Sequence, residues 1–248
     1  ASELNSTFGG GKFANTLRFT YSFQDEPRST DGKIFPFVDI LKDGKAFTSF
    51  GTELFSYCNL REVKTTTITD DFTWTMGKIR FSAGLQYEHN ATKNGFMRFG
   101  SSFYVFKSWD DFVNGAKPQN FGITFSNTPG YEQAFPSFEF NQFSGYIQDE
   151  IAVNDKLKVS AGFRVDLPTY SQPAQEHPMV STLTFGDRKF STATLPKSRL
   201  LVAPRVGFNY DINGDRSLIV RGGTGIFTGR VPFVWIVGQV SDAGMIQT

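Results

Sequence analysis

A period-two alternation of apolar and polar residues returns along most of this chain, and each run ends in a turn rich in glycine or asparagine. Between Phe13 and Phe23 the odd positions are mostly aromatic or apolar, whereas the even positions are small, polar or charged. Successive side chains of a β-strand point to opposite faces, so such a run predicts a strand with one apolar and one polar face. The repetition of this pattern predicts an all-β fold.

The pattern divides the chain into a meander of antiparallel strands. Eight segments fit it, at about 2–8, 13–24, 62–76, 79–88, 142–153, 157–166, 205–211 and 218–228. Four tight turns join them in pairs, at 9–11, 77–78, 154–155 and 213–214. The last of these turns is Asn-Gly, a strong signal for a short hairpin. Pro168 is expected to end its strand, because proline supplies no N–H to a ladder.

The other connections are long and fall on the side opposite the tight turns, at about 25–60, 91–138, 167–201 and 230–248. Bacterial outer-membrane barrels have this asymmetry, with short periplasmic turns and longer extracellular loops. Their strands need about 9–11 residues to cross the membrane, which most of the predicted runs supply. We therefore expect a transmembrane antiparallel β-barrel that is integral to the bacterial outer membrane and in contact with its lipid. A soluble β-sandwich with an aromatic core is the alternative.

The long connections also bear on the size of the barrel. Loops of this length are out of proportion for a small barrel and are normally functional. Residues 1–5 look like the middle of a strand and not like a targeting segment, and residues 241–248 end in an apparent loop. We expect residues 1–248 to form part of one larger barrel domain, with a closed eight-stranded barrel as the alternative.

Composition argues against several classes of function. Lys and Arg (25) balance Asp and Glu (24), so a net charge of +1 gives no electrostatic reason to expect nucleic acid as a partner. The single Cys58 excludes an internal disulfide and a cysteine metal cluster. No apolar run approaches the roughly 20 residues of a transmembrane helix. The chain is instead unusually rich in aromatic residues, among them 28 phenylalanines.

Catalytic and cofactor signals are weak. His89 and His177 lie far apart at or in predicted external loops, and Glu88 points to the opposite face of its strand from His89. Residues 211–215 begin like a calcium loop but lack its later glycine and glutamate. The glycines of 223–229 have the wrong spacing for a dinucleotide fingerprint and instead indicate a bend or a close backbone approach. We expect no enzyme, no cofactor and no metal.

If the apolar side chains meet lipid, the polar side chains of the same strands line the barrel interior. These interior residues are Arg18, Arg80, Gln86, Glu88, Arg164, Asp166, Arg205 and Arg221. Aromatic residues near the predicted strand ends are expected at the membrane interface, where barrels carry aromatic girdles. These are Tyr21, Phe23, Trp74 and Tyr87. Arg230, Phe233 and Trp235 follow a glycine-rich strand end and are expected to face the mouth of the barrel and to contact substrate.

The second long connection has local structure of its own. Ser108 is a good N-cap, Asp110 and Asp111 supply an acidic first turn, and Asn114-Gly115 is a stop signal, so a short helix is expected. The helix would either cover the barrel mouth or fold the loop onto itself. The aromatic residues of 96–112 leave a similar choice between ligand contact and a small core for the loop.

Several motifs resemble a known family. The stretch 145–150, followed by 154–157 and 161–166, resembles a signature of TonB-dependent outer-membrane transporters. The stretches 35–41, 48–51, 203–210, 221–230 and 232–235 resemble the Oar-like subgroup of Bacteroidetes and myxobacteria, whose members carry an N-terminal carboxypeptidase-regulatory-like domain. The resemblance extends over nearly the whole chain.

The resemblance implies a barrel of about 22 strands with an N-terminal plug, energised by the TonB–ExbB–ExbD system. Because plug, TonB box and C-terminal strands are not recognised in 1–248, they are expected in the full-length protein, and the interior polar residues would contact the plug. A surface lipoprotein is a further candidate partner. The implied function is active import of an unidentified substrate such as a peptide, glycan or metal chelate. A non-transporting receptor or adhesion protein with the same barrel is the alternative.

Overall fold

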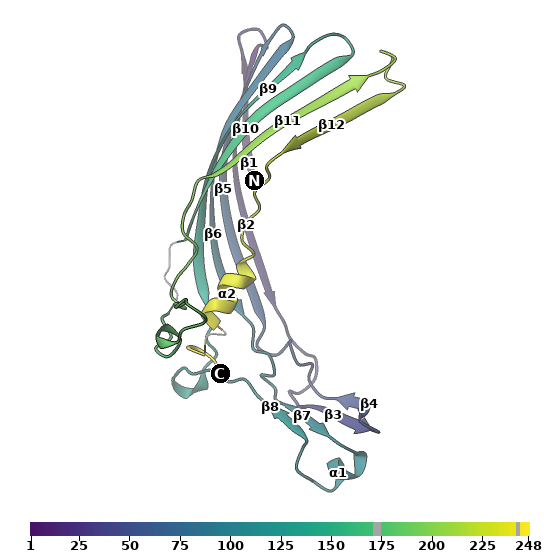
Figure 1. Ribbon diagram of the computed structural model, residues 1–248, viewed down its shortest axis with the longest axis vertical. Helices are drawn as coiled ribbons and strands as arrows, with labels where there is room; N and C mark the ends of the chain where they lie inside the picture. Colours follow the sequence, from purple (N-terminus) through teal and green to yellow (C-terminus); the bar gives the residue numbers. More distant parts are fainter. Residues whose placement is uncertain (171–174, 242–243) are drawn as a thin grey trace.

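The computed structural model describes residues 1–170, 175–241 and 244–248. Most of them form one antiparallel sheet in the order β1-β2-β5-β6-β9-β10-β11-β12. The strands are β1 (Ser2–Phe8), β2 (Phe13–Pro27), β5 (Leu60–Met76), β6 (Ile79–Gly95), β9 (Ser137–Ala152), β10 (Leu157–Tyr170), β11 (Leu201–Asp211) and β12 (Ile219–Gly225). Figure 1 shows a tall, curved sheet with β1 and β12 at its two edges, so the barrel is not closed within this chain.

All eight predicted strands are confirmed, but several continue further on the side of the long connections. The prediction that Pro168 ends its strand is wrong, because β10 continues to Tyr170. Pro168 pairs with Gln142 of β9, whereas the pairing of β10 with β11 ends at Asp166 and Leu201. Pro168 therefore lies where β10 has a partner on one side only, and proline is tolerated at such an edge.

The tight turns are confirmed at one end of the sheet, and one of them is larger than expected. The Asn213–Gly214 turn belongs to a connection that runs from 212 to 218. The Asp211 carboxylate accepts hydrogen bonds from the backbone N–H groups of Gly214 and Arg216, each at 2.9 Å. These two hydrogen bonds stabilise the longer loop in place of a two-residue hairpin. They also occupy the Asp211 carboxylate, with which the calcium-loop-like sequence begins, with backbone donors.

The register gives the sheet two chemically different faces. One row of paired residues runs Arg18, Thr69, Gln86, Ser144 and Asp166, and we call its face the inner face. The next row runs Leu17, Asp70, Leu85, Gly145 and Val165, and we call its face the outer face. All eight residues predicted to line the interior share the inner face, and the four predicted interface aromatics share the outer face. Tyr87 lies in the middle of β6 and not near its end, because β6 continues to Gly95.

The first two long connections fold together into a second sheet that the sequence pattern did not reveal. Its order is β4-β3-β7-β8, formed by β3 (Phe37–Lys42), β4 (Lys45–Phe50), β7 (Phe103–Phe106) and β8 (Asn120–Gly122). Strands β3 and β7 pair in parallel, so the two connections share a ladder. Figure 1 places this sheet at the opposite end from the tight turns. We call residues 28–59 and 96–136 the loop subdomain.

The predicted helix of the second connection is confirmed as α1 (Trp109–Val113). Ser108 Oγ accepts a hydrogen bond from the Asp111 N–H at 3.1 Å, as expected of an N-cap. Helix α1 packs on the second sheet, where Phe112 joins a cluster of Val38, Ile40 and Phe106. The helix therefore folds the loop onto its neighbour, and part of the aromatic cluster forms a small core. Short 3₁₀ turns lie at Pro129–Tyr131 and Val180–Thr182.

Strand β12 ends at Gly225 and not at 228 as predicted, and the following stretch, which was expected to be a long loop, contains a helix. Helix α2 (Phe233–Ser241) follows a stretch without regular structure at 226–232. We call residues 226–241 the return segment, because it packs back on the sheet: Ile236 and Val237 are buried against Phe138 of β9. The chain then reaches the loop subdomain, where Phe125 and Thr248 exchange two backbone hydrogen bonds of 2.9 Å. None of the described helices is long and apolar enough to cross a membrane.

Candidate functional site on the inner face of the sheet

Asp166 is the centre of a hydrogen-bond network on the inner face. The side chain is 7% exposed and pairs with Arg164, whose Nη2 lies 2.9 Å from Oδ1. Ser144 Oγ donates to the same oxygen at 2.6 Å, and Gln142 Nε2 donates at 3.1 Å. Arg164 also donates to Gln86 Oε1 at 3.2 Å. The network joins β6, β9 and β10 into one wall, with every polar group close to a partner of suitable chemistry.

Glu88 is the second buried carboxylate of the inner face. Its Oε2 pairs with the Arg230 guanidinium of the return segment, and its Oε1 accepts from Asn90 Nδ2 at 2.6 Å. Asn90 is 1% exposed and in turn accepts from Thr65 Oγ1 at 2.7 Å. A buried carboxylate is costly unless it is paired and hydrogen-bonded, and Glu88 is both. The return segment thus supplies the counter-charge for a residue of the sheet.

Apolar contacts hold the return segment beside these carboxylates. The Phe233 ring lies 5.3 Å from the Phe138 ring and 5.5 Å from the Phe140 ring, centroid to centroid. Thr228 Oγ1 lies 3.4 Å from Asp166 Oδ2, so both buried carboxylates contact this segment. Trp235 points away from the packed side, with 69% of its surface exposed.

Two of the predicted sets meet at this site. Gln86, Glu88, Arg164 and Asp166, predicted to line the interior, lie together, and Arg230, predicted to contact substrate, joins them through Glu88. The other interior residues lie apart. Arg18 pairs with Glu3 at 2.7 Å near the β1 edge, and the Arg205 guanidinium lies 4.7 Å from the Phe227 ring centroid.

Some residues of the site were not recognised in the sequence. Gln142, Ser144 and Asn90 support the two carboxylates, and Phe138 and Phe140 receive α2. The two phenylalanines occupy inner-face positions where the alternation otherwise places polar residues. That break in the pattern is the signal that a further segment covers this part of the inner face.

Glycines allow two close backbone approaches in the sheet. A Cβ on Gly223 would lie 2.8 Å from the Val206 carbonyl oxygen, and one on Gly225 would lie 2.7 Å from that of Pro204. The close approach expected of the 223–229 glycines is therefore toward the neighbouring strand β11 at these two positions.

Comparison with known proteins identifies the fold of this wall. Residues 4–242 match the family model described as an outer membrane beta barrel domain. The chain belongs to this family. A search of curated proteins gives no match.

Two solved structures resemble the barrel-domain chain at low identity. The outer membrane transporter YddB from Escherichia coli matches with a TM-score of 0.45 and 13% identity, over 90% of this chain and 24% of that one. The copper transporter OprC matches with a TM-score of 0.41 and 9% identity, over 86% of this chain and 28% of that one. The chain thus spans about a quarter of the length of each of these transporters.

Membership of the outer-membrane barrel family assigns an environment to each face. The outer face, which exposes Leu85, Ile147 and Phe163, meets the lipid of the outer membrane. The inner face, with its buried carboxylates, meets the lumen. Outer-membrane barrels keep short turns on the periplasmic side and longer loops on the extracellular side.

The loop subdomain of the barrel forms a cavity with the end of the chain. It has a volume of about 320 Å³ and is lined by Phe96, Arg98, Thr124, Gly244, Gln247 and Thr248. Gln247 Nε2 donates to the Phe96 carbonyl oxygen at 2.9 Å, which ties the two parts of the cavity wall together. A guanidinium beside aromatic rings suits a ligand that carries a carboxylate or another oxygen-rich anionic group.

A second cavity of the loop subdomain, of about 290 Å³, is lined in part by Arg28, Tyr57 and Cys58. Burial raises the pKa of the Cys58 thiol, which keeps it protonated and poorly reactive at neutral pH. Within the described residues no group of His, Cys, Asp and Glu side chains is arranged to hold a metal ion. His89 Nδ1 lies 2.8 Å from Asn141 Oδ1 on the outer face, and His177 Nδ1 accepts from the backbone of Met179 and Val180.

Proposed function

We propose that this chain is part of the wall of a TonB-dependent transporter of the Oar-like type, which imports a peptide, a glycan or a metal chelate. Binding at the extracellular loops would be followed by movement of protein inside the lumen, driven by the TonB–ExbB–ExbD system. In the full-length protein, a plug domain and further strands would complete a barrel of about 22 strands. No covalent chemistry is involved, and the chain is proposed not to be an enzyme.

The position of the return segment is the observation that carries this proposal. The segment covers part of the inner face and is held there by Arg230 and by the buried side of α2. Folded protein therefore occupies space beside the wall where an open porin would hold water. Passage of a large solute then requires a part to move, and an external energy source supplies that movement.

The same geometry supports a proposal for the residues that contact substrate and plug. We assign first contact with substrate to the cavity beside Arg98 and to the exposed Trp235, with Arg230 and Phe233 at the inner end of the path. Arg80 and Arg221 make no ion pair within the described part of the chain. They are proposed to contact the plug, as are Arg18 and Arg205. Tyr21, Phe23, Trp74 and Tyr87 are proposed to lie at the membrane interface.

The proposal is tested by nutrient uptake in the native host. Three strains are compared: the wild type, a strain in which this gene is deleted, and a strain in which tonB is deleted. Each strain grows with oligopeptides, oligosaccharides or an iron chelate as the sole source of the limiting nutrient. We expect both deletions to abolish growth on one of the three nutrients, with growth on small sugars that pass porins unchanged.

A second candidate function predicts a different result. Exposed aromatic residues of the loop subdomain, among them Phe47 (62%) and Trp109 (51%), favour a surface that binds a partner protein such as a lipoprotein. A receptor or adhesion protein predicts normal growth of the gene-deletion strain on all three nutrients and loss of attachment to a surface or to neighbouring cells. That pair of results would overturn the transport proposal.

A further inference from the structure

We propose that the outer face carries a binding site for one lipid acyl chain that bears a hydrogen-bond donor, an amide N–H or a hydroxyl, with Asp70 as the acceptor. The inference rests on the membrane placement of the outer-membrane barrel family and does not depend on the transport function proposed above.

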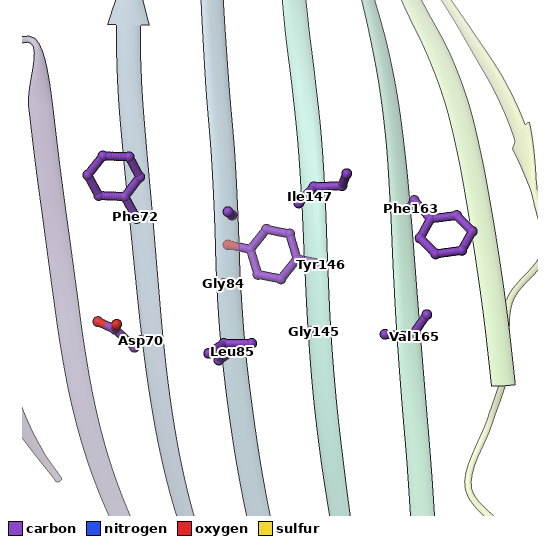
Figure 2. Close-up of a pocket in the computed structure, with 10 residues that line it drawn as sticks. Asp70, Phe72, Gly84, Leu85, Gly145, Tyr146, Ile147, Phe163 and Val165 are labelled. Atoms are coloured by element: carbon purple, nitrogen blue, oxygen red, sulfur yellow. The ribbon is translucent and has the colours of Figure 1, made fainter. Parts of the chain in front are cut away.

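A notch of about 470 Å³ lies on the outer face across β5, β6, β9 and β10 (Figure 2). Its floor has no side chain at Gly145 and only a methyl group at Ala83, and the backbone of Gly84 also lines it. Apolar side chains form its walls: Phe72, Leu85, Ile147, Phe163 and Val165. Figure 2 shows the bare strand backbone at Gly145 between Leu85 and Val165. Ala83 of β6 pairs with Ile147, and Gly145 of β9 pairs with Leu85. The notch therefore exists because two small outer-face residues lie diagonally across the ladder between neighbouring strands.

A side chain at Gly84 would clash with a residue of the inner face and would not enter the notch. The Tyr146 ring lies over Gly84, where an added Cβ would come within 2.3 Å of Tyr146 Cε1. Tyr146 OH donates to Asp71 Oδ1 at 2.7 Å across the strand. Gly145 is not constrained in this way, since an added Cβ would meet Leu85 Cδ2 only at 3.4 Å. A side chain at Gly145 thus fits the fold, and its absence leaves the notch open.

Asp70 stands at the edge of this notch in a mostly apolar part of the outer face. Its outer-face neighbours along β5 are Ile68 and Phe72, and its partners across the ladders are Leu17 and Leu85. Carboxylates on the lipid face of a barrel are unfavourable, because hydrocarbon supplies no water to solvate them. Asp70 therefore needs a donor from the protein or from the surrounding lipid.

The protein satisfies one of the two carboxylate oxygens. Asn15 Nδ2 donates to Asp70 Oδ1 at 2.7 Å. Among the residues that the structure describes, no other side chain donates to Asp70, so Oδ2 is left open. A donor carried by an acyl chain in the notch would meet this oxygen. An ester-linked chain without a hydroxyl offers no donor, whereas an amide-linked or hydroxylated chain does, and hydrogen bonds to a charged acceptor are the strong ones.

The site is tested with two photoreactive probes on the full-length protein in lipid nanodiscs. The probes are a diazirine-bearing hexadecanamide and the matching methyl hexadecanoate, which share a chain and differ in the N–H donor. Peptide mapping by mass spectrometry then locates the cross-links. We expect the amide to label the notch strands, at residues such as Leu85 and Ile147, about tenfold more than the ester.

Three variants distinguish the contribution of the notch to labelling from that of the Asp70 acceptor. Gly145→Leu fills the notch and is expected to remove labelling by both probes there. Ala161→Leu adds the same bulk elsewhere on the outer face and is expected to leave labelling unchanged. Asp70→Leu keeps the notch but removes the acceptor, so the amide and the ester should label it equally.

The wild-type protein alone can overturn the inference, so it does not depend on the folding of any variant. Equal labelling by the two probes would show that Asp70 selects no donor. Labelling spread evenly over the outer face would show that the notch holds no chain. Protection of the notch from both probes by a second copy or another protein would assign this face to a protein contact and would likewise overturn the proposal.

Discussion

Arg230 and Glu88 form an ion pair that joins the return segment to the middle of β6, across 142 positions of the chain. The two partners are unequally buried, with 7% of the Glu88 side chain exposed and 47% of the Arg230 side chain. Glu88 therefore depends on the pair more than Arg230 does, because an unpaired carboxylate in a buried site keeps its desolvation cost. The pair acts as a latch between a long connection and the wall of the barrel.

We expect Arg230→Gln to loosen the return segment. Because the guanidinium is half-exposed, the free energy that holds the segment on the sheet should fall by only about 1–2 kcal/mol. Local opening of the segment should then be roughly tenfold faster. Hydrogen exchange of residues 226–241 in the full-length protein measures this opening. Lys158→Gln is the matched control, since it removes an exposed pair with Glu150 at 3.5 Å near the tight turns. Equal exchange in wild type and Arg230→Gln would contradict the latch.

Arg164→Met should lower the stability of the barrel wall. The change leaves the Asp166 carboxylate with Ser144 and Gln142 but without its cation, and loss of a buried partner costs about 3 kcal/mol. The measurement is the midpoint of thermal unfolding of the full-length protein in detergent. Lys158→Met serves as the control, because its ion pair with Glu150 is exposed on both sides and contributes little to stability. Equal unfolding temperatures for the two variants would show that the Asp166 network does not stabilise the barrel wall.

Gly84→Ala should destabilise the sheet through the Tyr146 ring. The new Cβ would lie 2.3 Å from Tyr146 Cε1 and 2.6 Å from Asp71 Oδ1, which forces the ring away from its hydrogen bond. Overpacking of this kind costs about 1–3 kcal/mol. In the Tyr146→Ala background the same change should cost much less. A double-mutant cycle on thermal stability tests this coupling, and strictly additive effects would refute it.

Cys58 should react slowly with iodoacetamide in the folded protein. Burial raises the pKa of its thiol, and only the thiolate is nucleophilic. The raised pKa means that the reactive form appears only at a pH above the ordinary range of a cysteine. A profile of labelling rate against pH should therefore show its midpoint at a higher pH in the folded protein than in the unfolded protein. Coincident midpoints would contradict the burial of this thiol.

The large sheet was predictable because its signal is local. Each strand alternates with a period of two and each tight turn has its own residues, so strand order and the face of Arg164 or Asp166 follow from the sequence. The ends of the strands did not follow from the pattern. Strand β6 continues past Tyr87 to Gly95 through residues of mixed polarity, because both of its neighbours continue beside it.

The elements that the sequence pattern did not predict are formed by tertiary contacts. Strand β3 forms by pairing with β7, more than sixty positions away, and short strands of this kind carry too few residues for a periodic signal. Helix α2 lies in a stretch that the sequence pattern assigned to a long loop, and it forms where Ile236 and Val237 are buried against Phe138. The partnership of Arg230 with Glu88 likewise depends on how the return segment folds back.

The two faces of the sheet are tested most directly by spin labels placed one at a time along β6 and β9 of the full-length protein in membranes, with Cys58 replaced. Collision rates with oxygen report exposure to lipid, and collision rates with a water-soluble nickel chelate report exposure to the lumen. Outer-face positions such as Leu85 and Ile147 should favour oxygen, and the inner-face positions Ser82 and Gln148 should favour the chelate or be shielded from both. A period-two alternation in the ratio of the two rates is the predicted result. High chelate accessibility at Leu85 and Ile147 would contradict a sheet that meets lipid with one face and the lumen with the other.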